Sequence, residues 1–261
     1  MITSLRNSCD GLVMLYVVAY SWGKKYREEY VDRLRRGIAR NLRMDHRFAL
    51  ISDDGRQVKG CESWLIPDED LDLTTIPGCL ARLRLFDPQY LAKYGASKVI
   101  VVDLDTVITG SLDRVFDRPE PFVIFQGCNS INPCPYNGST WMLSAGYRPD
   151  VWSDFSLAAA SNVPNYLFPE DQAWMAYKIP NAAGWRVGPS SGLYGFKKKH
   201  WPTSEKRLPR DAKIVTFVGT RDPIQYTYLD WIKEHWLAEY GFLHPEDGQP
   251  SEENQAFRSF V

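Results

Sequence analysis

Short apolar runs alternate with segments of helical spacing along the first half of the chain. Apolar side chains recur every four residues between Lys24 and Arg43, which predicts an amphipathic helix there. The runs that flank this helix, and two that follow, have the length of buried strands. These expected strands are Leu12–Ala19, Arg47–Ser52, Cys61–Ile66 and Lys98–Leu104. Strands and helices in this order are typical of an α/β fold with a mostly parallel central sheet flanked by helices.

The second half of the chain has a less regular pattern. Its expected strands are Phe122–Gln126, Ser139–Leu143 and Lys213–Val218, with a long loop over 127–138 that is rich in Asn, Pro and Cys. The expected helices, here and just before the fourth strand, are Gly78–Phe86, a short one from Pro88 to Gly95, Pro149–Ala160, Pro169–Tyr177 and Thr227–Tyr240. We expect a single domain over residues 1–243, followed by a polar tail over 244–261.

Composition narrows the function classes only slightly. With 261 residues, 44% of them hydrophobic, the chain is long enough for one large domain. A formal net charge of −1 gives no reason to expect a nucleic-acid partner. The apolar stretch Leu12–Tyr20 is too short to span a bilayer, so we expect no membrane span. The five cysteines form no Cys-x-x-Cys pair, and their odd number favours a reducing, cytoplasmic location over a complete disulfide framework.

Two carboxylates follow the most apolar of the expected strands. Val99–Val102 leads directly into Asp103, Leu104 and Asp105. If the strand geometry continued, the two acids would share one face while Leu104 pointed into the core. Ligands bind beyond the carboxyl ends of strands in open α/β sheets, and adjacent carboxylates suit a hard divalent cation such as Mn²⁺ or Mg²⁺. The simpler alternative is a strand-end turn with two solvated acids.

Several motifs occur along the chain in a characteristic order. They are Leu80-Ala81-Arg82-Leu83-Arg84-Leu85, Asp103-Leu104-Asp105 followed by Gly110-Ser111-Leu112, Asn137-Gly138-Ser139, Asp171-Gln172 and Phe217-Val218-Gly219. This order resembles the GT-A glycosyltransferases of family 8, the group of glycogenin and bacterial galactosyltransferases. The resemblance spans roughly residues 13–224, and its most specific segment is Val99–Phe116.

The resemblance implies roles for individual residues. Asp103 and Asp105 would hold the metal that bridges the diphosphate of a nucleotide-sugar donor, and Arg82 would lie beside that donor. Asp171 and Gln172 would form the catalytic pair beside the reacting carbon. The remaining residues that the resemblance places around the donor are Ala19, Tyr20, Asp53, Leu104, Asn137, Gly219 and Arg221. By the same resemblance, residues 1–116 form the nucleotide-sugar-binding half and residues 117–243 form the acceptor and catalytic half.

Most of these residues also have a purely structural explanation. Arg82 could be a helix-surface arginine, and Asp171 could be a first-turn acid that complements a helix dipole after Pro169. Asp53 opens an Asp-Asp-Gly sequence, and Asn137 opens an Asn-Gly-Ser sequence, both of which are turn signals. The residues alone leave these alternatives open.

One motif departs from the family pattern. The family's late strand reads His-Phe-x-Gly-x-x-Lys-Pro, in which the histidine is a third metal ligand and the lysine touches the diphosphate. Here Thr216 occupies the histidine position and Asp222 occupies the lysine position. Arg221, one residue earlier, could supply the missing positive charge. A threonine hydroxyl is a much poorer metal ligand than an imidazole nitrogen.

The resemblance implies an enzyme that moves a hexose from a UDP-sugar to an acceptor, with metal dependence and retention of configuration. The acceptor could be a glycan, a protein or a small molecule, and the oligomeric state is unspecified. The strongest alternative enzyme is a haloacid-dehalogenase-type phosphatase, because Asp103-Leu104-Asp105-Thr106-Val107 fits its first motif. Against it, that motif normally follows the first strand of the chain. A third possibility is a non-catalytic nucleotide-sugar binder.

Overall fold

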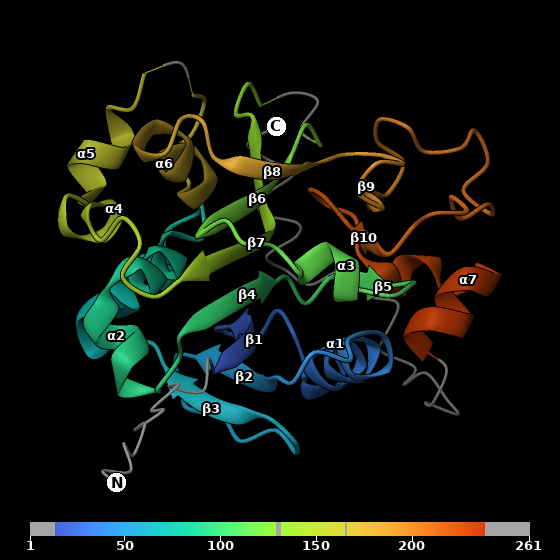
Figure 1. Cartoon of the computed structure of the whole chain (residues 1–261), viewed down its shortest axis with the longest axis horizontal. Helices are drawn as coiled ribbons and strands as arrows, with labels where there is room; N and C mark the ends of the chain where they lie inside the picture. Colours follow the sequence, from blue (N-terminus) through green and yellow to red (C-terminus); the bar gives the residue numbers. More distant parts are fainter. Residues whose placement is uncertain (1–13, 129–131, 165, 238–261) are drawn as a thin grey trace, which may run out of the picture.

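A seven-stranded sheet forms the centre of the molecule (Figure 1). The structure is a computed structural model that describes residues 14–128, 132–164 and 166–237. The strand order is β3-β2-β1-β4-β7-β6-β8, and every strand is parallel to its neighbours except β7. The strands are β1 (Leu15–Ser21), β2 (Arg47–Ser52), β3 (Glu62–Leu65), β4 (Lys98–Val102), β6 (Phe122–Gln126), β7 (Tyr136–Ser144) and β8 (Ala183–Arg186). This arrangement confirms the expected α/β class with a mostly parallel central sheet.

A smaller sheet lies beside the large one. It has the order β5-β10-β9, with β10 antiparallel to β5 and parallel to β9. Its strands are β5 (Thr106–Ile108), β9 (Leu193–Gly195) and β10 (Ile214–Thr216). Because β5 follows β4 after only three residues, the chain passes directly from the large sheet into the small one.

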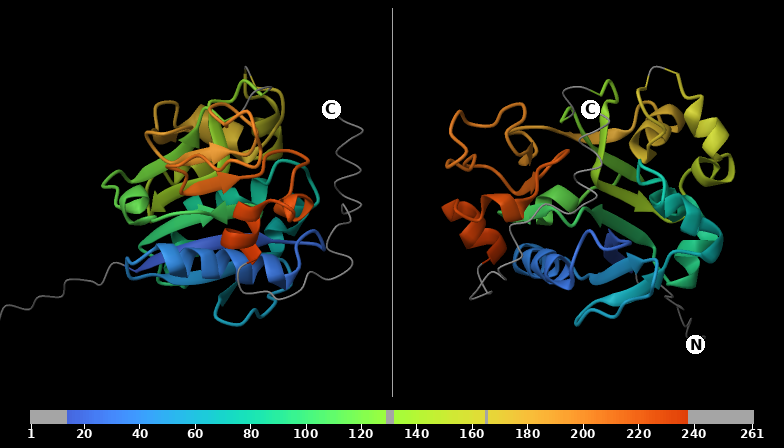
Figure 2. Two further views of the ribbon diagram at one scale, coloured as in Figure 1. Left: turned by 90° about the vertical axis from the view of Figure 1, so that its right-hand side faces the viewer. Right: turned by 180° about the vertical axis from the view of Figure 1, so that it is seen from behind.

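Helices cover both faces of the large sheet. One face packs against α1 (Glu28–Asn41), and the segments α7 (Asp230–Ile232) and η4 (Lys233–Leu237) lie beside that helix (Figure 2). The opposite face packs against the following short helices. They are η1 (Asp68–Thr74), η2 (Leu80–Phe86), α2 (Pro88–Lys93), α4 (Asp150–Ser153), α5 (Leu157–Ser161) and α6 (Asp171–Lys178). The remaining helices are α3 (Asp113–Phe116) and η3 (Pro223–Tyr226).

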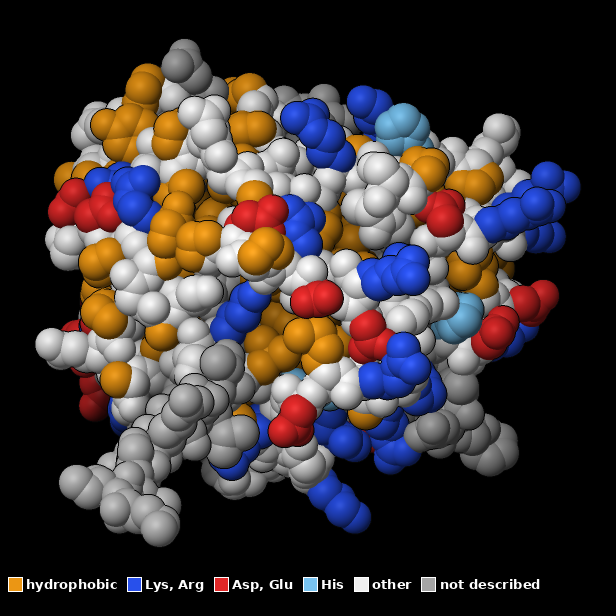
Figure 3. Space-filling model, viewed as in Figure 1, with side chains coloured by type: hydrophobic (Ala, Val, Ile, Leu, Met, Phe, Trp, Pro, Cys, Tyr) orange, Lys and Arg blue, Asp and Glu red, His pale blue; other side chains and the backbone are white. Residues whose placement is uncertain are grey.

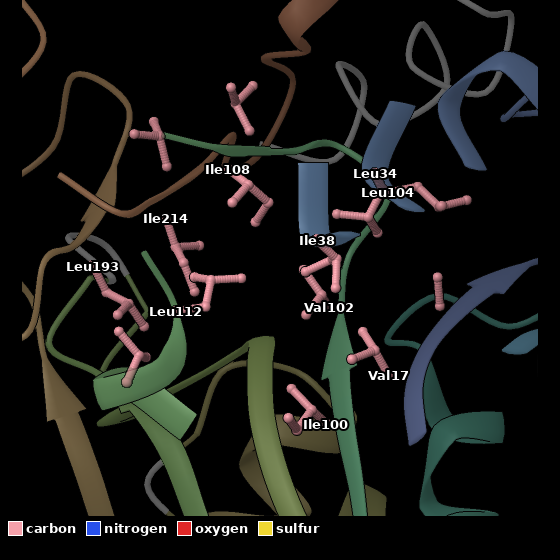
Figure 4. Close-up of a cluster of buried hydrophobic side chains, with 14 of the residues drawn as sticks. Val17, Leu34, Ile38, Ile100, Val102, Leu104, Ile108, Leu112, Leu193 and Ile214 are labelled. Atoms are coloured by element: carbon pink, nitrogen blue, oxygen red, sulfur yellow. The ribbon is translucent and has the colours of Figure 1, made fainter. Parts of the chain in front are cut away.

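Alternation along the strands divides the core in two. Val17, Ile100 and Val102 point toward α1, and Figure 4 shows them gathered with Leu34 and Ile38 of that helix. Their neighbours in sequence, among them Val99 and Val101, point to the other face. Both sets are almost fully buried, so the two cores fix the register of β1 against β4. The carboxyl ends of these strands are therefore held at one edge of the sheet.

The expected elements agree with the structure to different extents. The strand bounds over residues 47–52 and 122–126 are confirmed, and β7 extends the expected strand at 139–143 at both ends. The expected helix over 78–86 is a 3₁₀ helix from residue 80, because its first two residues have positive φ. The expected helix over 149–160 is two helices, since Ser156 caps α5 and its side chain accepts from the Ala159 N–H at 3.1 Å.

The end of the chain also differs from the expectation. The segment expected as one helix over residues 227–240 contains α7 and the π-helical η4, preceded by η3. The polar tail at 244–261 lies outside the described residues. No helix in the described ranges is both long and apolar enough to cross a bilayer. On the face drawn in Figure 3, acidic and basic side chains are interspersed, in keeping with the near-neutral net charge.

Candidate active site

The acid pair lies in the turn that joins the two sheets. The strand β4 ends at Val102, so Asp103 and Asp105 do not share a strand face as the sequence pattern predicted. The N–H of Asp103 still bonds to Ser139 in β7 at 2.9 Å, after which the chain turns into β5. Leu104 is only 1% exposed and points into the core as expected. The turn therefore presents two partly exposed carboxylates at the carboxyl edge of the sheet.

A buried arginine connects this turn to two other parts of the chain. The side chain of Arg82, on η2, is within 2.5 Å of a carboxylate oxygen of Asp103 and 2.7 Å of one of Asp171. It also donates to the backbone oxygen of Gly138 at 3.0 Å. Arg82 is 5% exposed and Asp171 is 2% exposed. The surface-arginine interpretation of Arg82 is therefore wrong, because its guanidinium is fully engaged inside the protein.

Close backbone contact brings η2 and α6 together. The N–H of Asp171 donates to the carbonyl of Gly78 at 2.8 Å. Gly78 has φ +107°, and a Cβ at this position would lie 2.5 Å from the carbonyl oxygen of Pro169. Only glycine permits both the backbone angle and the close approach. The start of α6 is thus fixed directly beside the arginine of η2.

The amide of Gln172 is held beside the same arginine. Its Oε1 accepts from the N–H of Gly138 at 3.0 Å, and its Nε2 donates to Glu170 at 2.8 Å. A Cβ on Gly138 would lie 2.6 Å from Nη2 of Arg82, so the glycine allows the strand to approach the guanidinium. The Asn-Gly-Ser sequence predicted only a turn at Gly138. A glycine inside a strand is the signal that would have indicated this close approach.

Asn137 lies within β7, so its placement in a loop was wrong. A register shift in the pairing of β6 with β7 falls between Ile124 and Phe125, and Phe125 then pairs with Asn137. The side chain of Asn137 accepts from the N–H of Ser139 at 3.1 Å. Asn137 is therefore one residue from Gly138, which contacts both Arg82 and Gln172.

Burial and charge shift the acidity of these groups. Burial raises the pKa of Asp171 to about 6, and the positive charge of Arg82 opposes this rise. Burial also raises the pKa of Asp105 to about 7, and the negative charge of Asp103 adds to it. Asp105 accepts a hydrogen bond from the hydroxyl of Tyr26 at 2.9 Å. The site thus gathers more negative charge than Arg82 alone compensates.

The end of β1 lies close to this cluster. Tyr20 is 8% exposed, and no hydrogen-bond partner for its buried hydroxyl is found in the described part of the chain. Burial raises the pKa of Tyr20, and the charges of Arg82 and Asp171 both act on it. Ala19 is fully buried, so only its backbone can face a ligand. Asp53 follows β2 and accepts from the N–H of Gly23, in the loop between β1 and α1, at 3.0 Å.

The strand β10 and the residue that follows it contact the segment that contains the acid pair. Thr216 pairs with Thr106 in β5, and the N–H of Phe217 bonds to the backbone oxygen of Asp105 at 3.3 Å. Asp222 caps η3 and accepts from the hydroxyl of Tyr30 at 2.8 Å. Gly219 and Arg221 lie in the loop between β10 and η3.

The carboxylate oxygens of this turn suit a divalent cation that is bound partly by the protein and partly by the oxygens of a ligand. Among residues 14–128, 132–164 and 166–237, no group of three or more His, Cys, Asp or Glu side chains is arranged to hold a metal. Two carboxylates in one turn, one of them with a pKa raised partly by the other, nevertheless favour a positive charge between them. Oxygen ligands are those that Mn²⁺ and Mg²⁺ prefer, and such ions often take further oxygens from phosphate and water.

Comparison with known proteins identifies the fold. No model of a protein family matches the chain, and no curated protein matches its sequence. Solved structures do match. The galactosyltransferase LgtC, solved with donor and acceptor sugar analogues, is 12% identical with a TM-score of 0.55, and the match covers 88% of this chain and 98% of LgtC.

Two further glycosyltransferases match in the same way. GlyE of Streptococcus pneumoniae TIGR4 is 12% identical with a TM-score of 0.55, over 87% of this chain and 64% of GlyE. A glycosyltransferase involved in glycosylation of the major capsid of PBCV-1 is 15% identical with a TM-score of 0.50, over 80% of this chain and 94% of that protein. The chain has the GT-A glycosyltransferase fold. Its architecture is similar to that of LgtC, in keeping with the expected fold.

Proposed function

We propose that this protein is a metal-dependent glycosyltransferase that moves a hexose from a UDP-sugar to an acceptor. One observation carries the proposal: segments far apart in sequence gather Asp103, Asp171 and Gln172 around the buried Arg82. This cluster lies at the carboxyl edge of the sheet, where α/β proteins bind ligands. The GT-A fold supports the same reaction class. We further propose that residues 1–116 bind the donor and residues 117–243 bind the acceptor.

Asp103 and Asp105 would hold Mn²⁺ or Mg²⁺ together with the donor diphosphate. The bound cation would stabilise the negative charge that develops on the leaving diphosphate. Arg82 fixes the position of Asp103 through its ion pair and so keeps the carboxylate aimed into the turn. The backbones of Ala19 and Leu104, together with Tyr20, Asp53, Asn137, Gly219 and Arg221, would complete the proposed donor site.

Asp171 and Gln172 would act next to the sugar. One oxygen of Asp171 contacts Arg82, and the other accepts from the N–H of Gln172 at 2.7 Å. Both oxygens of a 2% exposed carboxylate are therefore in use, which disfavours Asp171 as a nucleophile. We propose that Asp171 positions Arg82 and Gln172, and that retention arises when the acceptor attacks on the face from which the diphosphate leaves.

A second candidate function is a nucleotide-sugar binder without turnover. Thr216 favours it, because a hydroxyl stands where the related enzymes have a histidine ligand. The phosphatase alternative has less support, since the acid pair follows β4 rather than the first strand of the chain. For location, we propose the cytoplasm, in keeping with the free state of Cys61, Cys79, Cys128 and Cys134.

A panel of nucleotide sugars incubated with Mn²⁺ tests the proposal. We expect release of the nucleoside diphosphate from at least one UDP-sugar, slow with water and faster when a suitable acceptor is added. If the protein only binds nucleotide sugars, one of them should raise the melting temperature of the protein while no nucleoside diphosphate is released. Phosphate release from simple phosphate esters, with no action on nucleotide sugars, would support the phosphatase instead.

A further inference from the structure

The loop that joins β1 to α1 is fixed at the same edge of the sheet as the acid pair (Figure 1). Asp53 accepts from the N–H of Gly23, and Arg56 donates to the carbonyl of Gly23 at 3.1 Å. Arg56 also donates to the side chain of Ser21 at the end of β1, at 3.3 Å. The N–H and the C=O of Gly23 are therefore both held by side chains that follow β2.

This loop carries a lysine toward the acid pair. The ammonium nitrogen of Lys25 lies 4.7 Å from the ring centroid of Tyr26, in a cation–π contact. The hydroxyl of Tyr26 in turn donates to Asp105 at 2.9 Å. The charge of Lys25 also partly opposes the rise in pKa that burial causes in Asp222. Lys25 therefore lies one side chain away from Asp105, across the ring of Tyr26.

Arg82, which contacts Asp103, has little capacity left for a ligand. Arg82 uses its guanidinium on two carboxylates and one carbonyl, so few of its N–H groups remain for a ligand. Asp222 stands where the family 8 motif has lysine, and it adds a carboxylate to the loop after β10. A diphosphate that approaches Asp105 therefore meets several negative charges, which a divalent cation compensates only in part.

We propose that Lys25 binds the diphosphate of the donor, and thereby replaces the positive charge that Asp222 removes from the late loop. The inference rests on the proposed function and names a phosphate-binding residue that the motifs did not indicate. Lysine binds phosphate as a point charge on a flexible stem, so the partly exposed Lys25 can move from the Tyr26 ring to a phosphate oxygen.

Binding of UDP, UMP and uridine in the presence of Mn²⁺, measured by titration calorimetry, tests this role. We expect Lys25→Gln to weaken UDP binding on the order of 10-fold or more, because it removes a contact to a charged group. Uridine binding should be unchanged, since uridine has no phosphate. Lys25→Arg should retain most of the UDP affinity. Lys24→Gln, which removes an exposed neighbouring charge, is the matched control and should leave all three affinities unchanged.

Each result separates the inference from the proposed function. If the parent protein binds UDP and the Lys25→Gln variant binds it equally well, the proposed role of Lys25 is refuted, and the proposed function is unaffected. If Lys25→Gln loses uridine and UDP affinity to the same extent, the lysine supports the loop through Tyr26 and does not contact phosphate. If the parent protein does not bind UDP, the proposed function fails, and the inference fails with it.

Discussion

Removal of the buried guanidinium should have a large, pH-dependent effect on stability. Arg82→Met leaves Asp171 without its 2.7 Å partner at a position that is 2% exposed. Breaking a buried ion pair in this way costs about 3–5 kcal/mol of unfolding free energy. We expect this loss at pH 8, where Asp171 must remain ionised or take up a proton against the solution pH.

The loss should shrink as the pH falls. The pKa of Asp171 is already raised to about 6, and removal of Arg82 raises it further. When the pKa of a carboxyl is higher in the folded protein than its unfolded value of about 3.9, the free energy of unfolding falls as the pH rises between these two pKa values. At pH 5 Asp171 is protonated in the variant, and the neutral acid is cheaper to bury. The double variant Arg82→Met, Asp171→Asn should therefore be less pH-dependent than Arg82→Met.

Urea unfolding followed by circular dichroism at pH 5 and pH 8 measures these differences. Arg43→Met is the control, because Arg43 is 89% exposed in its pair with Asp113. Such a surface pair contributes about 0.2–1 kcal/mol. If Arg82→Met loses no more stability than Arg43→Met, and equally at both pH values, then Arg82 and Asp171 do not form the buried pair described here.

Two further predictions concern the same cluster. Gly138→Ala would place a methyl group 2.6 Å from Arg82, so we expect a loss of about 1–3 kcal/mol in unfolding free energy and slower donor hydrolysis. Gly146→Ala is the control: φ is +78° there but no atom lies within 4 Å, so this change should affect stability alone. Asp171→Asn or Gln172→Ala should lower turnover on the order of 10²-fold while donor affinity stays within a few-fold, because Asp171 positions Gln172, whose contact with the sugar we expect to form in the transition state. Full turnover in both variants would show that neither residue takes part in the chemistry.

The sequence predicted the large sheet better than the small one. Phe48–Ile51 and Val99–Val102 are continuous apolar runs, and such runs indicate buried strands without further information. The strands of the small sheet span three residues each and pair across long sequence separations. Of these, β10 lies within the strand expected over Lys213–Val218, whereas β5 and β9 were not expected, because a three-residue strand has too short a pattern to be distinguished from a loop. The start of β7 was missed because Asn137 and Gly138 are typical of turns.

The site was predicted mainly through the resemblance to family 8. The acid pair stands out in the sequence because it directly follows a buried strand. The contact of Arg82 with Asp171 joins residues 89 positions apart, and no local pattern indicates it. The proposed role of Lys25 has no local signal in the sequence either, since the loop before α1 is held by Asp53 and Arg56 from after β2. Long-range ion pairs of this kind follow from the tertiary structure.

The central claim is that Asp103 and Asp105 hold a divalent cation that binds the donor diphosphate. Titration of UDP into the parent protein, with Mn²⁺ and then with EDTA, tests it most directly. We expect binding that requires Mn²⁺, and we expect the double variant Asp103→Asn, Asp105→Asn to lose this requirement together with most of the affinity while its circular dichroism spectrum is unchanged. Equal UDP affinity with Mn²⁺ and with EDTA in the parent protein would contradict the account.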